Sequence, residues 1–148
     1  MNAVAAAETR SVVIERELPH PPEKVWRALT QPALLAEWMM ANDFQPAVGH
    51  RFQFTAQPAG NWDGVVKCEV LEVQPHTRLS YRWGVGGTTA ADGLSTLVTM
   101  TLTPSGKGTL LRMEQSGFRP EQERNFQGAK YGWQKFLGGL EQVLAKLD

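Results

Sequence analysis

The chain of 148 residues carries 15 basic and 15 acidic side chains, and this zero net charge gives no sign of a nucleic-acid or anionic-membrane surface. Its length suits one domain that buries about two-thirds of its unfolded surface. One cysteine, Cys68, excludes an intrachain disulfide, and no apolar run reaches the roughly 18 residues that span a bilayer. We therefore expect a soluble, cytoplasmic protein that binds neither nucleic acid nor membrane.

The N-terminal residues divide into a predicted tail and the start of a predicted domain. Residues 1–10 are Ala-rich and lack the basic start and the long apolar stretch of a signal peptide, so we interpret them as a disordered tail. Apolar and polar residues then alternate in SVVIEREL (11–18), which predicts a half-buried first strand. We expect one domain to occupy residues 11–148.

Two short helices are predicted after this strand, because the apolar spacing changes from two to three or four. Pro21 and Pro22 end the strand and can open a helix, and Glu23 lies in its first turn, where the helix dipole favours an acid. Pro32 ends that helix and begins a second one, which carries Trp38.

Five further strands are predicted where the period of two returns and turn signals separate the runs. These runs cover residues 50–56, 64–73, 78–84, 94–103 and 108–115. In the run 64–73, the apolar Leu71 and Val73 break the alternation and indicate a β-bulge or a covered second face. With the first strand at its edge, the sheet has six antiparallel strands and buries one face.

A long C-terminal helix is predicted from GWQKFLGGLEQVLAKL (132–147), whose apolar residues recur every three or four positions. Gly138 and Gly139 lie in its middle, although each glycine costs roughly 1 kcal/mol against alanine in a helix interior. Gly128 and Gly132 precede them, and glycines in such a helix allow bending or a close approach. We predict an α+β fold in which the curved six-stranded sheet wraps around this helix, with two short helices between strands 1 and 2.

The order of these elements resembles the helix-grip fold of START-like (SRPBCC) domains, birch-pollen-allergen-type proteins and polyketide cyclases. Five segments are similar to the family named after the activator of heat shock protein 90 ATPase, and the resemblance covers about residues 11–147. These segments are PPEKVWRALTQPALLAEWM, VGHRFQF, WDGVVKCEVLEVQPHTRLSYRW, GTLLRMEQSGF and GWQKFLGGLEQVL.

The resemblance to bacterial-type, single-domain members implies a hydrophobic tunnel between the sheet and the terminal helix. Elsewhere in the superfamily such a tunnel holds lipids, sterols or polyketides. The predicted domain accounts for the whole printed sequence, without the separate N-terminal chaperone-binding module of the eukaryotic co-chaperone. We therefore do not expect this chain to activate a chaperone, despite the name of the family.

The candidate binding residues are those that the predicted registers direct between the sheet and the helix. They are Trp38, Phe52, Phe54, Tyr81, Trp83, Met100, Met113, Gln115, Trp133 and Phe136. The alternative is that the aromatic residues only pack the core, and that Tyr81 and Gln115 bond to each other or to the backbone. The loop GVGGTTAADG (84–93) is predicted to be a gate at the cavity mouth.

No metal, cofactor or catalytic residue is expected. His20, His50 and His76 are each isolated in the sequence, without the spacing of metal ligands. Cys68 is central in a strand with no helix N-terminus beside it to lower the pKa of its thiol, which favours a core position. His50 begins a strand, and we leave open that it reaches the cavity mouth.

Three functions remain open. The first is binding of a small hydrophobic or aromatic ligand in the cavity, with no biological role assigned. The second is a cyclase- or hydrolase-type enzyme in which Tyr81, Gln115 or His50 moves a proton, which we favour less because no group tuned near neutrality is evident. The third is a stress-related or chaperone-associated interaction protein. The expected partner is a small apolar molecule, and a homodimer is left open.

Overall fold

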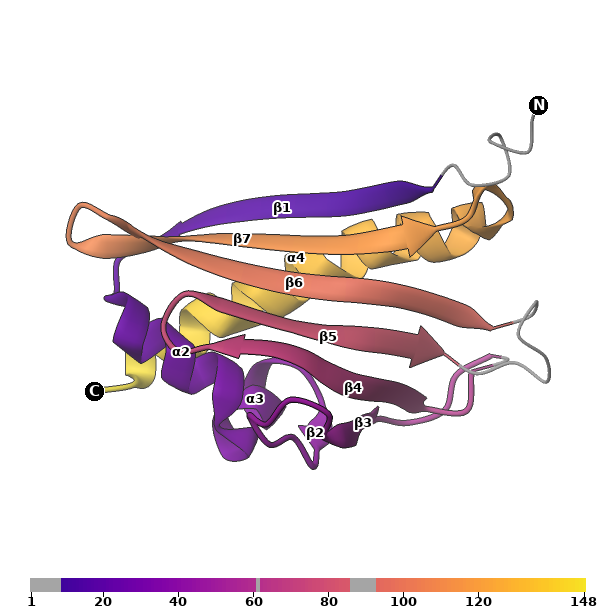
Figure 1. The fold of residues 1–148 in the computed structure, drawn as a ribbon, viewed down its shortest axis with the longest axis horizontal. Coiled ribbons are helices and arrows are strands. Elements are labelled where there is room, and N and C mark those ends of the chain that lie inside the picture. Colours follow the sequence, from indigo (N-terminus) through magenta and orange to yellow (C-terminus); the bar gives the residue numbers. More distant parts are fainter. Residues whose placement is uncertain (1–8, 61, 86–92) are drawn as a thin grey trace.

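The computed structural model describes residues 9–60, 62–85 and 93–148. The predicted tail therefore lies outside the described residues except for its last two positions, and so does most of the predicted gate loop. A seven-stranded antiparallel sheet forms one layer, and the helices cover one of its faces (Figure 1). The strand order is β1-β7-β6-β5-β4-β3-β2. The strands are β1 (Arg10–Leu18), β2 (Ala41–Asn42), β3 (Arg51–Thr55), β4 (Val65–Gln74), β5 (Arg78–Val85), β6 (Leu94–Ser105) and β7 (Gly108–Phe118).

The predicted count of six strands was wrong by one. The additional strand, β2, has only two residues, and it pairs with the far end of β3 through Ala41 with Thr55 and Asn42 with Phe54. Two residues are too few to produce an alternating pattern, so a search for periodicity cannot detect this strand. The other six strands are present where the sequence predicts them.

The two short helices follow the proline signals. Helix α2 spans Pro22–Thr30, and helix α3 begins at the next proline and spans Pro32–Trp38. The indole N–H of Trp38 donates to the main-chain oxygen of Ala28 at 2.9 Å, which joins the two helices inside the core. The position of α3 is thus fixed by a buried hydrogen bond as well as by apolar packing.

A bulge bends β4 at Leu71, which is one of the two explanations that the sequence leaves open there. The pairing of β4 with β5 shifts register between Val70 and Glu72, so Leu71 has no direct partner. A second register shift occurs in the pairing of β1 with β7, where Gly117 has no direct partner. Its φ of 103° is a conformation that glycine adopts readily. Because bulges increase local twist and bend a strand, they help to curve the sheet around the helix layer.

Helix α4 (Glu123–Lys146) runs along the covered face of the sheet, after a 3₁₀ turn at Pro120–Gln122 (Figure 1). Its second half packs most tightly, because Leu140 and Leu144 are completely buried. The chain therefore has the α+β helix-grip arrangement that the sequence predicts. None of the helices among the described residues has the length and apolarity needed to cross a membrane.

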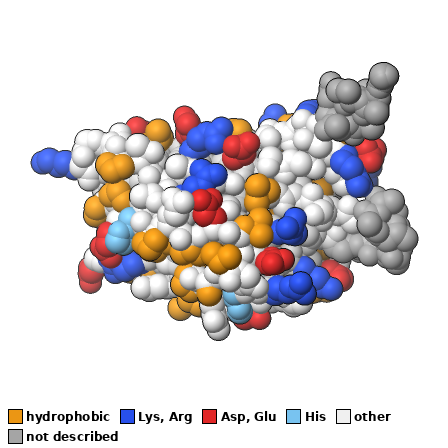
Figure 2. Space-filling model, in the orientation of Figure 1, with side chains coloured by type: hydrophobic (Ala, Val, Ile, Leu, Met, Phe, Trp, Pro, Cys, Tyr) orange, Lys and Arg blue, Asp and Glu red, His pale blue; other side chains and the backbone are white. Residues whose placement is uncertain are grey.

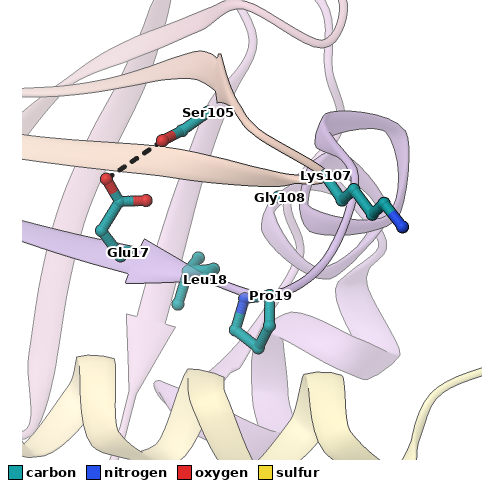
Figure 3. Close-up of a pocket in the computed structure, with 6 residues that line it drawn as sticks. All are labelled: Glu17, Leu18, Pro19, Ser105, Lys107 and Gly108. Carbon is teal, nitrogen blue, oxygen red and sulfur yellow. Dashed lines mark hydrogen bonds between the residues drawn. The ribbon is translucent and has the colours of Figure 1, made fainter.

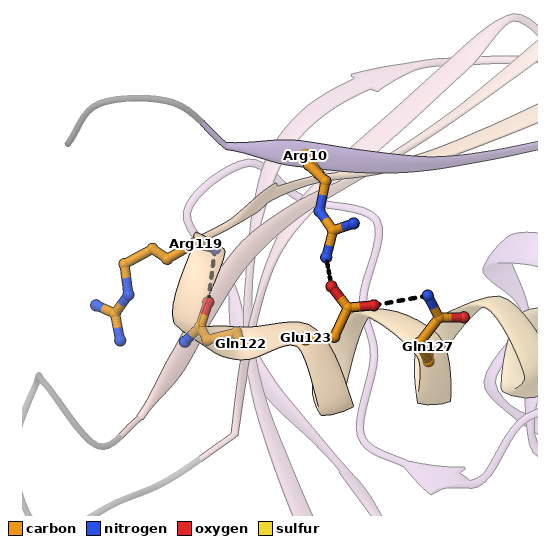
Figure 4. A network of polar contacts seen from close by, with 5 residues as sticks. All are labelled: Arg10, Arg119, Gln122, Glu123 and Gln127. Carbon is orange, nitrogen blue, oxygen red and sulfur yellow. Dashed lines mark hydrogen bonds and ion pairs between the residues drawn. The ribbon is translucent and has the colours of Figure 1, made fainter. Parts of the chain in front are cut away.

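Polar contacts fix the start of α4 (Figure 4). The Arg10 guanidinium pairs with the Glu123 carboxylate, and Gln127 donates to the same carboxylate at 2.7 Å. The hydrogen bonds from Gln127 and Arg10 lower the pKa of Glu123 below its usual range. Gln122 accepts from the main-chain N–H of Arg119 at 2.9 Å and donates to the Gly93 carbonyl at 3.3 Å. These bonds connect the helix start to both β1 and the beginning of β6.

The uncovered face of the sheet is mixed in character. Figure 2 shows basic and acidic side chains interspersed with hydrophobic ones on the face in view. Within β7, Arg112 pairs with Glu114 at 2.8 Å, and it lies 3.9 Å from Glu15 on the neighbouring strand β1. Such exposed pairs contribute little to stability, so this face gives no evidence of a concentrated charge of one sign.

Candidate functional site

A cavity of about 180 Å³ lies between the first half of α4 and strands β5, β6 and β7. The described residues that line it are Trp83, Leu94, Gln115, Asn125, Gly128, Ala129, Gly132, Trp133 and Phe136. It is therefore in the space that the sequence predicts for a ligand.

The residues contributed by α4 form one stripe along the helix. Asn125, Gly128, Gly132 and Phe136 are separated by three or four positions, which places them on the same side. A β-carbon at Gly128 or Gly132 would meet no heavy atom within 4 Å, apart from the nearby backbone of the helix itself. The two glycines thus leave unfilled space beside the aromatic walls.

A larger hollow of about 360 Å³ lies elsewhere, beside the hairpin between β6 and β7 (Figure 3). Ser105 donates to Glu17 across it at 3.1 Å, while Lys107 points away from the other labelled side chains. Glu17, Ser105 and Lys107 belong to a shallow surface region without an aromatic wall. We therefore regard the smaller, aromatic cavity as the candidate site despite its lower volume.

A chain of three hydrogen bonds crosses the wall of the candidate cavity. The indole N–H of Trp133 donates to Gln115 Oε1 at 2.7 Å, and Gln115 Nε2 donates to Thr96 Oγ1 at 2.8 Å. Thr96 in turn donates to the main-chain oxygen of Trp83 at 3.1 Å. Because an indole N–H can only donate, the atom that it contacts must be the amide oxygen, which fixes the orientation of Gln115.

These contacts correct the alternative, raised from the sequence, that Gln115 and Tyr81 bond to each other. Its partners are Trp133 and Thr96 rather than Tyr81. Among the described contacts, the amide nitrogen Nε2 has a second N–H that donates to no residue, and the amide oxygen Oε1 has a second lone pair that accepts from none. We call these two its unused positions. Gln115 is 1% exposed and borders the cavity, so its free positions can orient a bound group.

The described lining contains no side chain that titrates near neutral pH. It has no carboxyl, imidazole, amine or thiol among its nine residues. The buried polar groups are bonded to one another, as in many enzyme sites, but amide, indole and hydroxyl groups do not exchange protons as general acids or bases near pH 7. The arrangement can therefore hold and orient a ligand.

The ten candidate residues occupy two regions. Trp83, Gln115, Trp133 and Phe136 line the cavity. The other six are buried or nearly buried away from that lining: Trp38, Phe52, Phe54, Tyr81, Met100 and Met113.

Ring contacts connect the two regions. Phe52 packs against Tyr81 with ring centroids 5.4 Å apart, and Phe54 packs against Trp83 at 5.6 Å. Trp83 then contacts Trp133, also at 5.6 Å. The deeper aromatic residues thus support the residues that line the cavity.

Sequence reasoning omitted five lining residues. They are Leu94, Asn125, Gly128, Ala129 and Gly132. Gly128 and Gly132 could have been found, since the sequence already marked them as unusual in a helix. Asn125 and Ala129 could have been found from their helical spacing to Trp133 and Phe136.

The remaining candidates for proton transfer do not line the cavity. Burial raises the pKa of the Tyr81 hydroxyl above its ordinary value of 10.0 and the pKa of the Cys68 thiol above 9.0, so both groups keep their protons at neutral pH. His50 bonds through Nε2 to the Asp43 carbonyl at 2.9 Å and stacks on Phe52. Within the described part of the chain, no group of three potential metal ligands comes together.

Comparisons with known proteins agree with this architecture. Protein MLL2253 from Mesorhizobium loti is 55% identical, with a TM-score of 0.85 over 94% of this chain and 99% of that one. DynU16, from the dynemicin biosynthetic locus, is 28% identical, with a TM-score of 0.75. The alignment with DynU16 covers 92% of this chain but only 47% of that one.

A more distant structure shows the same fold. The Aha1 dimer from Colwellia psychrerythraea has 19% identity and a TM-score of 0.76, over 91% of this chain and 96% of that one. No curated protein matches the chain. A family model described as "Activator of Hsp90 ATPase homolog 1-like protein" matches residues 19–145. The chain therefore belongs to the family of Activator of Hsp90 ATPase homolog 1-like proteins.

Proposed function

We propose that this protein binds a small apolar molecule in the cavity between α4 and the sheet. The observation that carries the proposal is the placement of Gln115, a buried amide held by Trp133 and Thr96 at the edge of an aromatic cavity. Ligand sites are typically apolar pockets with a few polar groups that fix orientation. The absence of titratable groups from the described lining favours binding over acid–base catalysis.

The volume limits the size of the ligand. Pockets for drug-sized molecules measure about 300–1,000 Å³, whereas this cavity measures about 180 Å³. An engineered apolar cavity of about 150 Å³ in another protein binds benzene. The cavity is open beside the exposed Asn125 and Gly128, so we expect the part of the ligand that it holds to be about as large as one six-membered ring.

Two relatives support a role with small molecules or in assembly. DynU16 is a protein of a biosynthetic locus, and a binding cavity would suit such a setting. The Colwellia protein is a dimer, and native mass spectrometry would show whether this chain also forms one. Chaperone association and stress response have no support from the cavity.

Toluene binding provides a direct test, with two glycine variants as a matched pair. Gly132→Leu fills the cavity, because Gly132 lines it and has open space at its β-carbon. Gly138→Leu adds the same side chain to the same helix, also at a position with open space, but away from the cavity. In ¹⁵N–¹H spectra, toluene should shift the Trp133 indole signal in the wild type and in Gly138→Leu, but not in Gly132→Leu.

The pair separates loss of the site from loss of the fold. Both variants should unfold cooperatively and be at least as stable as the wild type, since leucine favours a helix more than glycine does. Equal toluene binding by all three proteins would contradict the proposed location. Failure of toluene to bind the wild type at its solubility limit would contradict the proposed function.

A further inference from the structure

We infer that the ligand is an uncharged molecule with one aromatic ring and one hydroxyl group, and that Gln115 recognises the hydroxyl. This inference rests on the proposed function, because it assigns a chemical class to the ligand of the same cavity. The assignment comes from three features of the lining: its aromatic walls, the unused positions of one amide, and its lack of charge.

The walls favour an aromatic ring over an aliphatic chain of the same volume. The rings of Trp83 and Trp133 are inclined by 50° with centroids 5.6 Å apart, and those of Trp133 and Phe136 by 77° at 5.5 Å. Inclined rings present both edges and faces, and aromatic pairs are most favourable in edge-to-face or offset arrangements. A further ring can therefore extend a set of contacts that the protein already makes.

The amide of Gln115 favours a hydroxyl substituent. One N–H and one lone pair of this amide are unused within the described residues, while its other positions are occupied by Thr96 and Trp133. A hydroxyl can both donate and accept, so it can use either position without rotation of the amide. Rotation would be unfavourable, because it would place an N–H against the donor-only indole of Trp133.

The lining also selects against charge. None of its nine described residues is ionised at neutral pH, so a buried carboxylate or ammonium group would have no ion partner there. An aromatic cage could still bind a cation if its rings surrounded a space. Here, however, Trp133 is in direct ring contact with both Trp83 and Phe136, which leaves no space between these rings for an ammonium group.

The hydroxyl is tested with phenol and toluene, two probes of nearly equal size. Their affinities are measured by calorimetry or NMR for the wild type and for Gln115→Met, an apolar variant of similar length. The ratio of phenol to toluene affinity should fall about tenfold in the variant, the net effect of one lost hydrogen bond. An unchanged ratio would overturn the role of Gln115, even if toluene still bound and the proposed function remained valid.

Wild-type measurements keep the inference testable if Gln115→Met does not fold. Phenol should shift the side-chain amide signals of Gln115, whereas toluene should shift the Trp133 indole signal but leave that amide nearly unchanged. Equal effects of the two probes on the Gln115 amide would contradict hydroxyl recognition.

Charge is tested with benzyl alcohol, benzylammonium and benzoate, which share a ring and differ in one group. At pH 7, each charged compound should bind at least about tenfold more weakly than the alcohol, because a charge placed beside the buried amide of Gln115 would have no ion partner there. Preferential binding of benzylammonium would instead indicate a cation site on the aromatic faces. Preferential binding of benzoate would indicate a cationic residue at the site, and either result would overturn the assignment of an uncharged ligand.

Discussion

Two adjacent glycines in α4 allow helix propensity to be separated from packing. Gly138 has open space at its β-carbon, whereas a β-carbon at Gly139 would lie 3.4 Å from Trp38 Cβ and 3.5 Å from Trp38 Cα. Replacing either glycine with leucine adds the same side chain to the same helix. The two variants, Gly138→Leu and Gly139→Leu, should therefore differ only in their contact with α3.

The expected difference can be worked out from these distances. Leucine should stabilise the helix by about 0.8 kcal/mol relative to glycine at either position. At Gly139, a β-carbon alone makes an ordinary van der Waals contact, but the remaining carbons of leucine must enter the space of Trp38. Trp38 cannot easily move, because it is buried and bonded to Ala28. Overpacking of this kind costs about 1–3 kcal/mol, so Gly139→Leu should be the less stable variant by that amount.

Urea unfolding measures both free energies, with the slope of the transition as a check on two-state behaviour. For a chain of this length, 1 kcal/mol corresponds to about 2–4 °C in melting temperature. Gly138→Ala and Gly139→Ala serve as controls, because alanine adds only the β-carbon and both should be more stable than the wild type. If the two leucine variants were equally stable, the tight approach of α4 to α3 would be refuted.

Two further substitutions test buried polar groups. Tyr81→Phe should change the free energy of unfolding by less than about 1 kcal/mol at pH 7, since no described residue hydrogen-bonds to the hydroxyl. Burial raises the pKa of Tyr81 in the folded state, so the unfolded chain loses the hydroxyl proton first as the pH rises. The free energy of unfolding should therefore fall above pH 10.0. Tyr81→Phe should reduce that fall in urea titrations between pH 8 and 11. Thr96→Val should destabilise the fold by about 1–3 kcal/mol, because it leaves Gln115 Nε2 without its acceptor and removes the hydroxyl's bond to the Trp83 carbonyl. Equal stability of Thr96→Val and the wild type would mean that these bonds contribute nothing.

Local signals account for most of the fold that could be predicted. Prolines at positions 22 and 32 mark the starts of both short helices, and the period of two marks six of the seven strands. The break at Leu71 left two explanations open, and the bulge in β4 is the one that the structure shows. The exception is β2, whose pairing with β3 depends on where the chain goes after α3 and not on any local periodicity.

The site was less predictable, because it depends on contacts between distant segments. Periodicity shows that Gln115 and Trp133 face inward, but they lie on different elements, and only their packing reveals that one bonds to the other. Thr96 is absent from the predicted site, although it connects Gln115 to the backbone of β5. Period-two reasoning also cannot distinguish a residue that lines a cavity from one buried deeper on the same face, as the positions of Met100 and Met113 illustrate.

The glycines of α4 show that one helix covers two different kinds of space. Gly128 and Gly132 keep side chains out of a cavity, and Gly139 lets α4 approach the backbone of α3 closely. Substitutions in the first half of the helix can therefore alter the cavity without disturbing the core. The second half stabilises the fold, because Leu140 and Leu144 are completely buried. Because the two halves share one continuous helix, we expect the stable half to hold the cavity walls in place, so that the proposed ligand would not need to order them.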